Sequence, residues 1–259
     1  MSATRMPTPF DSSLLARVAS GERLCLFLDV DGTLLDIAPT PHAVRVDEPL
    51  RDLLLRVSDA LGGAVALVSG RPLAALDDLF GLASWPAAGL HGGERRDATG
   101  RVHVCAADGD RLEPVRAALR RLVAETPGAL LEDKTLGLAV HYRAVPEFEW
   151  RLRRIVRQCA VPLAPEYHVL DGKCVIEIKP AAASKARAIA EFLAEPPFAG
   201  RIPVFVGDDA TDVDGFAYVE EAGGVSVAVG DDLPAQLRLA SPREVRALLG
   251  HLAAGRQER

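Results

Sequence analysis

Two apolar segments of the chain end in paired acidic residues. LCLFL is followed by Asp29 and Asp31, and PVFVG is followed by Asp208 and Asp209. Carboxylates gathered in one place repel one another unless a cation lies between them. Oxygen ligands without histidine or cysteine favour Mg²⁺ over zinc or copper. These residues therefore predict a Mg²⁺ site, provided that the fold brings the two segments together.

A hydroxyl group and an ammonium group extend this set. Ser69 follows a third apolar segment, AVALV, and Lys185 follows Ser184, a candidate helix cap. A cation and an ammonium group offset the charge of a phosphate, and a hydroxyl group donates a hydrogen bond to a phosphoryl oxygen. The combination predicts a site for a phosphate ester.

Each of these features by itself has a simpler explanation. An Asp-x-Asp-Gly segment is often a turn, an Asp-Asp pair is usually a solvated loop, and a single lysine such as Lys185 is more often a surface charge. A calcium loop of the EF-hand kind is excluded, because Thr40 stands at the twelfth position, where a bidentate glutamate is needed. The joint occurrence of the features, in this order and after apolar segments, favours catalysis.

The spacing of apolar residues predicts the elements that hold these side chains. Residues 24–28 and 64–68 are short apolar runs, typical of strands buried on both faces. Leucines at helical spacing follow a helix start signal at residues 47–49. Alternating strands and helices predict an α/β fold with an open, mostly parallel sheet. Ligands of such sheets lie at the carboxyl ends of the strands, where the acidic residues stand.

The middle of the chain has a different pattern. Residues 97–100 predict a hairpin turn, and amphipathic helices near residues 112–123 and 148–159 alternate with strand-like segments. The parallel-sheet pattern returns at residues 203–209. We therefore predict a core domain formed by residues 1–107 and 173–259, interrupted by a smaller α/β domain formed by residues 108–172.

The composition is that of an ordinary globular protein. The 259 residues are 49% hydrophobic and 25% charged, and the formal net charge of −6 argues against nucleic acid or an acidic membrane as a partner. No apolar run approaches the roughly 20 residues of a membrane span, and the N-terminus lacks the layout of a secretory signal. The four scattered cysteines predict reduced thiols. We expect a cytoplasmic monomer that binds a small molecule.

Several stretches of the sequence resemble known families. DVDGTL, VSGR, Lys185 and GDDATD resemble the four motifs of the haloacid dehalogenase superfamily. GLHGGE, LEDKTLGLAVHYR and GKCVIEIKP resemble trehalose-6-phosphate phosphatases. The resemblance extends from about residue 24 to about residue 230. It implies a Rossmann-like core and an inserted cap domain of the C2 type, which closes over a sugar.

The resemblance implies a role for each core residue. Asp29 would attack phosphorus and become a transient aspartyl phosphate. Asp31 would protonate the leaving sugar oxygen and then activate water. Ser69 and Lys185 would hold the phosphoryl oxygens, and Gly70 would allow the backbone to approach the phosphate closely.

The resemblance also implies a metal site with support around it. The ligands of Mg²⁺ would be Asp29, the backbone carbonyl of Asp31, and Asp208. The supporting residues would be Thr33, Asp209 and Asp212. Thr33 would shape the turn that presents the aspartates, and Asp212 would steady its loop. Asp209 would either lie behind the metal ligands or steady Lys185.

Recognition of the sugar is implied mainly for the inserted domain. The residues that match contacts to the non-phosphorylated glucose are Glu132, Lys134, Arg143 and Glu177. Their charges suit sugar hydroxyls, which donate to carboxylates and accept from ammonium or guanidinium groups. Exposed charges on the strands of this domain are the simpler alternative. In the core, Arg71 belongs to the substrate-binding motif VSGR, and His91 either approaches the substrate or is structural.

These observations favour a Mg²⁺-dependent phosphatase that converts trehalose 6-phosphate to trehalose and phosphate, the last step of trehalose biosynthesis. One alternative is a phosphatase of another phosphosugar, of the sucrose-phosphate or mannosyl-phosphoglycerate type. Others are a phosphomutase and a non-catalytic phosphosugar-binding regulator of a synthase. We expect such a regulator to lack Asp29 or Asp31, and this chain has both.

Overall fold

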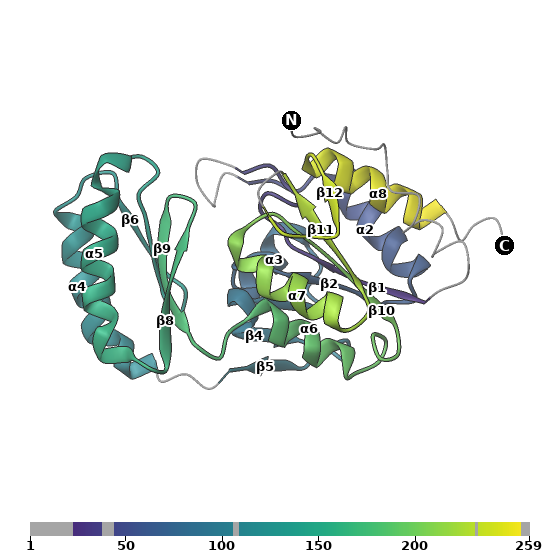
Figure 1. Cartoon of the computed structure of the whole chain (residues 1–259), viewed down its shortest axis with the longest axis horizontal. Coiled ribbons are helices and arrows are strands. Elements are labelled where there is room, and N and C mark those ends of the chain that lie inside the picture. The colour runs from purple at the N-terminus through teal and green to yellow at the C-terminus, as the bar shows by residue number, and fades with distance from the viewer. Residues whose placement is uncertain (1–22, 38–43, 106–108, 231–232, 255–259) are drawn as a thin grey trace, which may run out of the picture.

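The structure is a computed structural model that describes residues 23–37, 44–105, 109–230 and 233–254. Within these ranges the chain forms two sheets, one of eight strands and one of four. Figure 1 shows them in two domains, the larger sheet between layers of helices and the smaller sheet beside helices of its own. This arrangement confirms the predicted α/β fold with a mostly parallel central sheet.

The centre of the larger sheet is parallel. Its strands are β1 (Leu24–Leu28), β2 (Val65–Val68), β3 (Ala87–Gly89), β4 (Glu94–Arg96), β5 (Val102–Val104), β10 (Ile202–Gly207), β11 (Val225–Val229) and β12 (Leu237–Leu239). Their order is β12-β11-β10-β1-β2-β3-β4-β5, and only the β4–β5 end is antiparallel. β1 lies between β10 and β2. The strand that ends in Asp29 is therefore central.

β1 supplies side chains to both faces of this sheet. Leu24, Leu26 and Leu28 enter one core, whereas Cys25 and Phe27 enter the other. The first core lies under α2 (Glu48–Ala60), α3 (Leu73–Phe80) and α8 (Pro242–Ala254), and the second lies under α6 (Lys185–Leu193) and α7 (Val213–Glu221). A strand covered on both faces needs a continuous apolar run, which is what LCLFL provides.

Local signals in the sequence start the elements as predicted. Asp47 Oδ1 accepts the Leu50 amide at 3.0 Å and caps α2. Ser184 Oγ accepts the Arg187 amide at 3.1 Å and caps α6. Both bonds satisfy amide groups that have no partner inside the first turn of a helix. The turn at residues 97–100 joins β4 to β5, which confirms the predicted hairpin.

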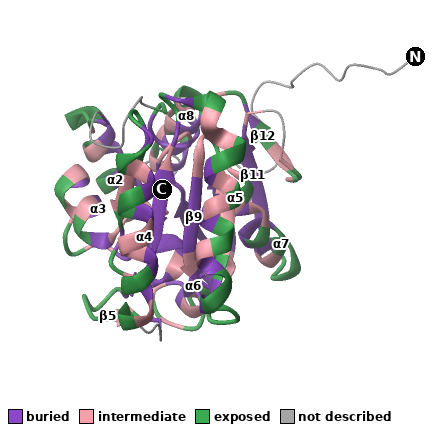
Figure 2. Cartoon of the chain, turned by 90° about the vertical axis from the view of Figure 1, so that its left-hand side faces the viewer, coloured by how far each residue is buried: buried purple, intermediate pink, exposed green. Residues whose placement is uncertain are grey.

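The smaller sheet is antiparallel and lies in the inserted domain. Its strands are β6 (Leu130–Asp133), β7 (Leu138–His141), β8 (Tyr167–Gly172) and β9 (Val175–Pro180), in the order β6-β7-β9-β8. α4 (Glu113–Ala124) and α5 (Glu149–Ala160) pack on one face and form a separate core with it. Figure 1 shows the other face turned toward the larger domain, and Figure 2 shows the exposed outer sides of α4 and α5.

The end of the inserted domain differs from the sequence-based boundary. β9 pairs with β7 and β8, so it is part of the smaller sheet. The boundary predicted after residue 172 falls in the turn of the β8–β9 hairpin, where turn residues resemble a linker in the sequence. The boundary predicted after residue 107 lies outside the described residues. We propose that the inserted domain extends to Pro180 and that the core domain resumes after it.

Two further predictions concern the whole chain. The four cysteines, Cys25, Cys105, Cys159 and Cys174, are all unpaired, as predicted. None of the helices in the described ranges is long and apolar enough to cross a membrane.

Packed aromatic rings beside α6 provide a test of the core. The ring centroid of Phe198 lies 5.4 Å from that of Phe27 and 5.1 Å from that of Phe192. Phe198→Ala removes a fully buried ring, so we expect urea denaturation to show a free energy of unfolding lower by about 3–5 kcal/mol. Leu55→Ala, at an exposed position of α2, is the control and should cost less than about 1 kcal/mol. Equal losses in the two variants would contradict this packing.

Candidate active site

The carboxyl ends of β1, β2 and β10 meet at one edge of the larger sheet, because β1 pairs in register with both neighbours. Lys185, the first residue of α6, lies at this edge. Its Nζ is 2.8 Å from Asp29 Oδ1 and 2.5 Å from Asp212 Oδ1. Burial favours the neutral amine, but the two carboxylates raise the pKa of Lys185 above its usual value. The side chain therefore stays positively charged.

Asp29, Asp208 and Asp212 form a carboxylate cluster. One oxygen of each lies within 4.8 Å of the others. Burial raises the pKa of Asp29 well above its usual value, against the effect of Lys185. Burial also raises the pKa of Asp208 to about 6, although Thr33 Oγ1 donates a hydrogen bond to it at 2.9 Å. The cluster thus has more acidic groups than Lys185 alone can offset.

The donor atoms of this cluster fit a hard divalent cation. Within the described part of the chain, the cluster consists of carboxylate oxygens, which are the ligands that Mg²⁺ prefers. A cation there would favour the charged forms of Asp29 and Asp208, which burial disfavours. Asp212 belongs to the cluster, although the resemblance implied only a supporting role for it. Asp31, whose backbone carbonyl was the expected ligand, turns its side chain to Arg71.

The two acidic residues that follow Asp208 contact different groups. Asp212 Oδ2 accepts the backbone amides of Asp208 at 3.0 Å and Asp209 at 2.9 Å, while its Oδ1 holds Lys185. Asp209 instead accepts the amide of Ala210 at 2.8 Å and caps a short 3₁₀ turn. Asp212, rather than Asp209, therefore steadies Lys185, because only its carboxylate turns inward and is fully buried.

Two glycines leave room for the side chains of the site. Gly32 has a φ of +91°, and a Cβ atom there would lie 2.0 Å from Asp208 Oδ2. A Cβ atom at Gly70 would lie 2.6 Å from Cε1 of His91. Both turns therefore require glycine, since any side chain would displace a residue of the site.

Arg71 holds the carboxylate of Asp31. Nε lies 2.6 Å from Oδ2 and Nη2 lies 2.7 Å from Oδ1, which makes a bidentate pair. The buried Ser69 accepts the Arg71 amide at 3.2 Å, a bond that uses the oxygen and not the hydroxyl proton. The Asp31 side chain is 37% exposed, whereas that of Asp29 is 7% exposed. Two aspartates one residue apart thus have different environments.

Residues of the inserted domain reach the same edge. Lys134 Nζ donates to the Gly70 carbonyl at 3.2 Å and lies 3.0 Å from Glu177 Oε2. His91 Nε2 lies 3.4 Å from the same oxygen. Burial acts to raise the pKa of Glu177, but Lys134 and His91 hold it below its usual value. Burial lowers the pKa of His91, which favours the neutral ring. Glu177 is therefore a buried carboxylate between the two domains.

Glu132 lies on the same face of the smaller sheet as Glu177. Glu132 pairs with Ala139 across the strands, and Ala139 pairs with Glu177, so a small residue separates the two carboxylates. Burial acts to raise the pKa of Glu132, but a 2.8 Å contact with His141 Nε2 helps to hold it below its usual value. Because Glu132 shares a face of the sheet with Glu177, which lies between the two domains, it faces the core domain.

Two residues of the stretch HYR contact different groups. Arg143 is exposed and donates to the Lys173 carbonyl at 3.2 Å, and no bond between described residues joins it to the carboxylates. His141, which was not among the expected sugar contacts, lies on the face that carries Ala139 and Glu132. Residues two apart in a strand share a face, and this alternation is the signal that could have found His141.

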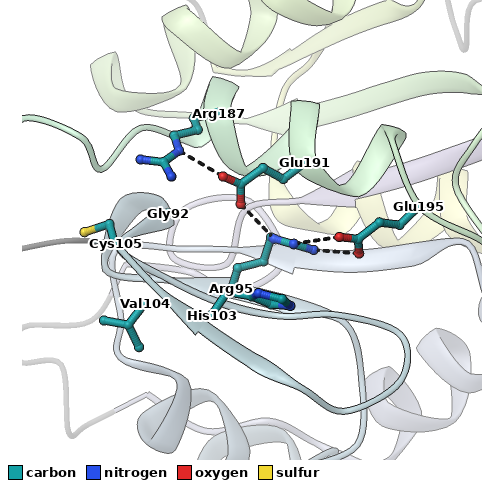
Figure 3. A pocket seen from close by; sticks show the side chains of 8 residues that line it. All are labelled: Gly92, Arg95, His103, Val104, Cys105, Arg187, Glu191 and Glu195. Carbon is teal, nitrogen blue, oxygen red and sulfur yellow. Dashed lines mark hydrogen bonds and ion pairs between the residues drawn. The ribbon is translucent and has the colours of Figure 1, made fainter.

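A hollow of about 350 Å³ between β4 and α6 lies apart from these carboxylates (Figure 3). Arg95 points toward α6, with Nε 2.9 Å from Glu191 and its Nη atoms 3.0 Å and 2.9 Å from Glu195. Arg187 also donates to Glu191, at 2.9 Å. These charged side chains pair with one another and join β4 to α6, which is a structural role. The hollow is therefore not part of the candidate site.

Comparisons with known proteins identify relatives of the chain. The sequence model of the trehalose-phosphatase family matches residues 27–235. A probable trehalose-phosphate phosphatase of Sinorhizobium fredii is 45% identical over 88% of this chain and 86% of its own. The trehalose-6-phosphate phosphatase of Escherichia coli is 40% identical over 90% of this chain and 88% of its own.

Solved structures agree on the fold. The C-terminal domain of a Candida albicans trehalose-6-phosphate phosphatase matches with a TM-score of 0.83 at 25% identity, over 97% of this chain and 99% of that one. A haloacid dehalogenase-like hydrolase of Bacteroides thetaiotaomicron matches with a TM-score of 0.64 at 14% identity, over 89% of this chain and 99% of that one, which shows the fold alone. The fold is thus of the haloacid dehalogenase type, and the chain belongs to the trehalose-phosphatase family.

Proposed function

We propose that the chain is a Mg²⁺-dependent phosphatase that hydrolyses trehalose 6-phosphate to trehalose and phosphate, in the last step of trehalose biosynthesis. The observation that carries this proposal is that two sets of charges face each other. Asp29 and Lys185 at the edge of the core suit a phosphate group, and Glu132 and Glu177 of the inserted domain suit a sugar rich in hydroxyls. Relatives at 45% and 40% identity are named for this activity.

In the first step, a carboxylate oxygen of Asp29 would attack phosphorus. Lys185 holds Asp29 Oδ1 at 2.8 Å, so it fixes the carboxylate and offsets negative charge. A bond forms between Asp29 and phosphorus, and the bond from phosphorus to the sugar oxygen breaks. Ser69 would donate a hydrogen bond from its hydroxyl group to a phosphoryl oxygen. The product is an aspartyl phosphate.

Asp31 would transfer protons in both halves of the reaction. It gives a proton to the leaving sugar oxygen, then takes one from the water that attacks the aspartyl phosphate, which releases phosphate and restores Asp29. In this structure the Asp31 carboxylate accepts two bonds from Arg71. To reach Asp31, the sugar oxygen of the bound substrate must replace at least one of these two bonds from Arg71. Arg71 would then be available to bind the substrate.

Asp29, Asp208 and the backbone carbonyl of Asp31 would hold Mg²⁺, with Asp212 close enough to contribute or to support them. When bound, the cation supplies positive charge that reduces the repulsion between Asp29 and the phosphate. Thr33 would keep Asp208 oriented through its 2.9 Å bond.

The inserted domain would act as a cap that selects the sugar. Glu132 and Glu177 would accept hydrogen bonds from hydroxyls of the non-phosphorylated glucose, and Lys134 would donate to one. The two glutamates are two strand spacings apart, roughly 10 Å, which leaves the width of a hexose above Ala139. Arg143 lies outside this row, so we do not propose it as a contact.

The choice of sugar separates this proposal from its alternatives. We expect faster phosphate release from trehalose 6-phosphate than from sucrose phosphate or mannosyl-phosphoglycerate. Efficient hydrolysis of only another phosphosugar would refute the proposed substrate. A phosphorylated isomer among the products would indicate a mutase, and binding without turnover would indicate a regulator.

A cytoplasmic location is the second part of the proposal. All four cysteines are unpaired, although two of them are only partly buried, and this suits a reducing compartment. The monomeric state stays a prediction from the sequence.

Asp29→Asn tests the proposed nucleophile. The amide cannot form the aspartyl phosphate, so we expect phosphate release to fall by at least about a thousandfold with an unchanged circular dichroism spectrum. Asp52→Asn, at an exposed position of α2, is the matched control and should keep wild-type activity. Activity of Asp29→Asn within tenfold of wild type would refute the assignment.

Removal of Mg²⁺ tests the carboxylate cluster. A chelator should abolish phosphate release, and added Mg²⁺ should restore it. Independently of activity, saturating Mg²⁺ should raise the Tm of the wild type by about 5–10 °C, because the cation binds only the folded chain. Asp208→Asn should lose most of this rise, whereas Asp52→Asn should keep it. An equal rise in Asp208→Asn would place the cation elsewhere.

Glu132→Ala combined with Lys134→Ala tests the sugar site. We expect kcat/KM for trehalose 6-phosphate to fall by about a hundredfold or more, because two charged contacts to hydroxyls are lost. Hydrolysis of p-nitrophenyl phosphate, which has no second sugar, should change by less than about threefold. Similar losses on both substrates would mean that these residues support the core instead.

A further inference from the structure

His141 contacts a proposed sugar-binding residue but has no part in the proposed chemistry. Its Nε2 lies 2.8 Å from Glu132 Oε2. His141 pairs with Leu130 across the strands, and Ala139 pairs with Glu132, so His141 is the diagonal neighbour of Glu132 on the same face. The register of β6 and β7 therefore builds this contact into the sheet.

Glu132 needs a partner to keep one orientation. Its side chain is 34% exposed, and fixing a free glutamate side chain costs rotamer entropy. The contact with His141 uses Oε2 of the carboxylate, so Oε1 can accept a hydrogen bond from a ligand. A carboxylate that is already oriented binds a hydroxyl at lower entropic cost than a mobile one.

The neighbours of His141 in the chain point elsewhere. Tyr142 lies on the opposite face, where its hydroxyl accepts hydrogen bonds from Arg153 at 2.9 Å and 2.7 Å. Arg143 is exposed beyond the end of β7 and donates to Lys173. Of the three residues in HYR, His141 alone lies beside Glu132.

We propose that His141 is a positioning residue, which donates a hydrogen bond from Nε2 to Glu132 and so orients this carboxylate toward the second sugar. The inference rests on the proposed function and deepens it. Because an ionised carboxylate only accepts, this bond requires a proton on Nε2 of His141. A glutamine amide at this position could donate in the same way, whereas a leucine side chain could not.

Steady-state kinetics of His141→Leu and His141→Gln test the proposal. For trehalose 6-phosphate we expect kcat/KM to fall about tenfold in His141→Leu, mainly through KM, and less than about threefold in His141→Gln. Turnover of p-nitrophenyl phosphate should stay within about twofold of wild type in both variants. His168→Leu, an exposed histidine of β8 on the same sheet, is the matched control and should resemble the wild type.

A double variant separates positioning from general loss of structure. In a Glu132→Gln background, His141→Leu should change kcat/KM by less than about twofold, because the carboxylate that it orients is gone. Full additivity, or equal loss on both esters, would overturn the proposal. His141→Ala replaces His141→Leu if thermal unfolding shows that the latter does not fold.

The wild type is assayed first, so that a failure of the proposed function is distinguished from a failure of the proposed role of His141. Absence of phosphate release from trehalose 6-phosphate would overturn the proposed function. Wild-type release together with unchanged kinetics in His141→Leu would overturn only the role of His141.

Discussion

The site depends on one buried ammonium group held between two carboxylates. Lys185 is 2% exposed, and it contacts Asp29 after β1 and Asp212 after β10. A buried charge costs several kcal/mol unless it is paired, so the ends of both strands and the start of α6 must come together. Ser184 caps α6 directly before Lys185 and so fixes where this helix begins. The fold and the proposed chemistry therefore depend on the same contacts.

The two sheets present different sets of polar side chains. The central strands β1 and β2 of the larger sheet are apolar and covered on both faces, so the polar residues Asp29 and Ser69 follow at their carboxyl ends. The smaller sheet is covered by helices on one face, and its other face carries Glu132 and Glu177 toward the core. Lys134 links the two, since it contacts both Glu177 and the Gly70 carbonyl. The proposed phosphate and sugar sites are thus built on different cores and meet between them.

Much of this could be predicted because it depends on residues that are close in the chain. The run LCLFL is apolar on both faces of a strand, and it is followed by Asp29 and Asp31 at a spacing that fits a strand end. Helix caps at Asp47 and Ser184 act within three residues of themselves. The glycine in DVDGTL fits a turn in which any side chain would collide with Asp208. Fold class, family and the core motifs all follow from such local patterns.

Other features depended on which distant segments lie side by side, and only the tertiary structure decided them. β9 joined the smaller sheet because it pairs with β7, which no local pattern encodes. Asp212 rather than Asp209 reached Lys185, because the direction of each carboxylate depends on burial. His141 rather than Arg143 came to lie beside Glu132, because strand register determines cross-strand neighbours. The sequence alone thus determined which groups are candidates for the chemistry, and long-range packing decided which of them meet.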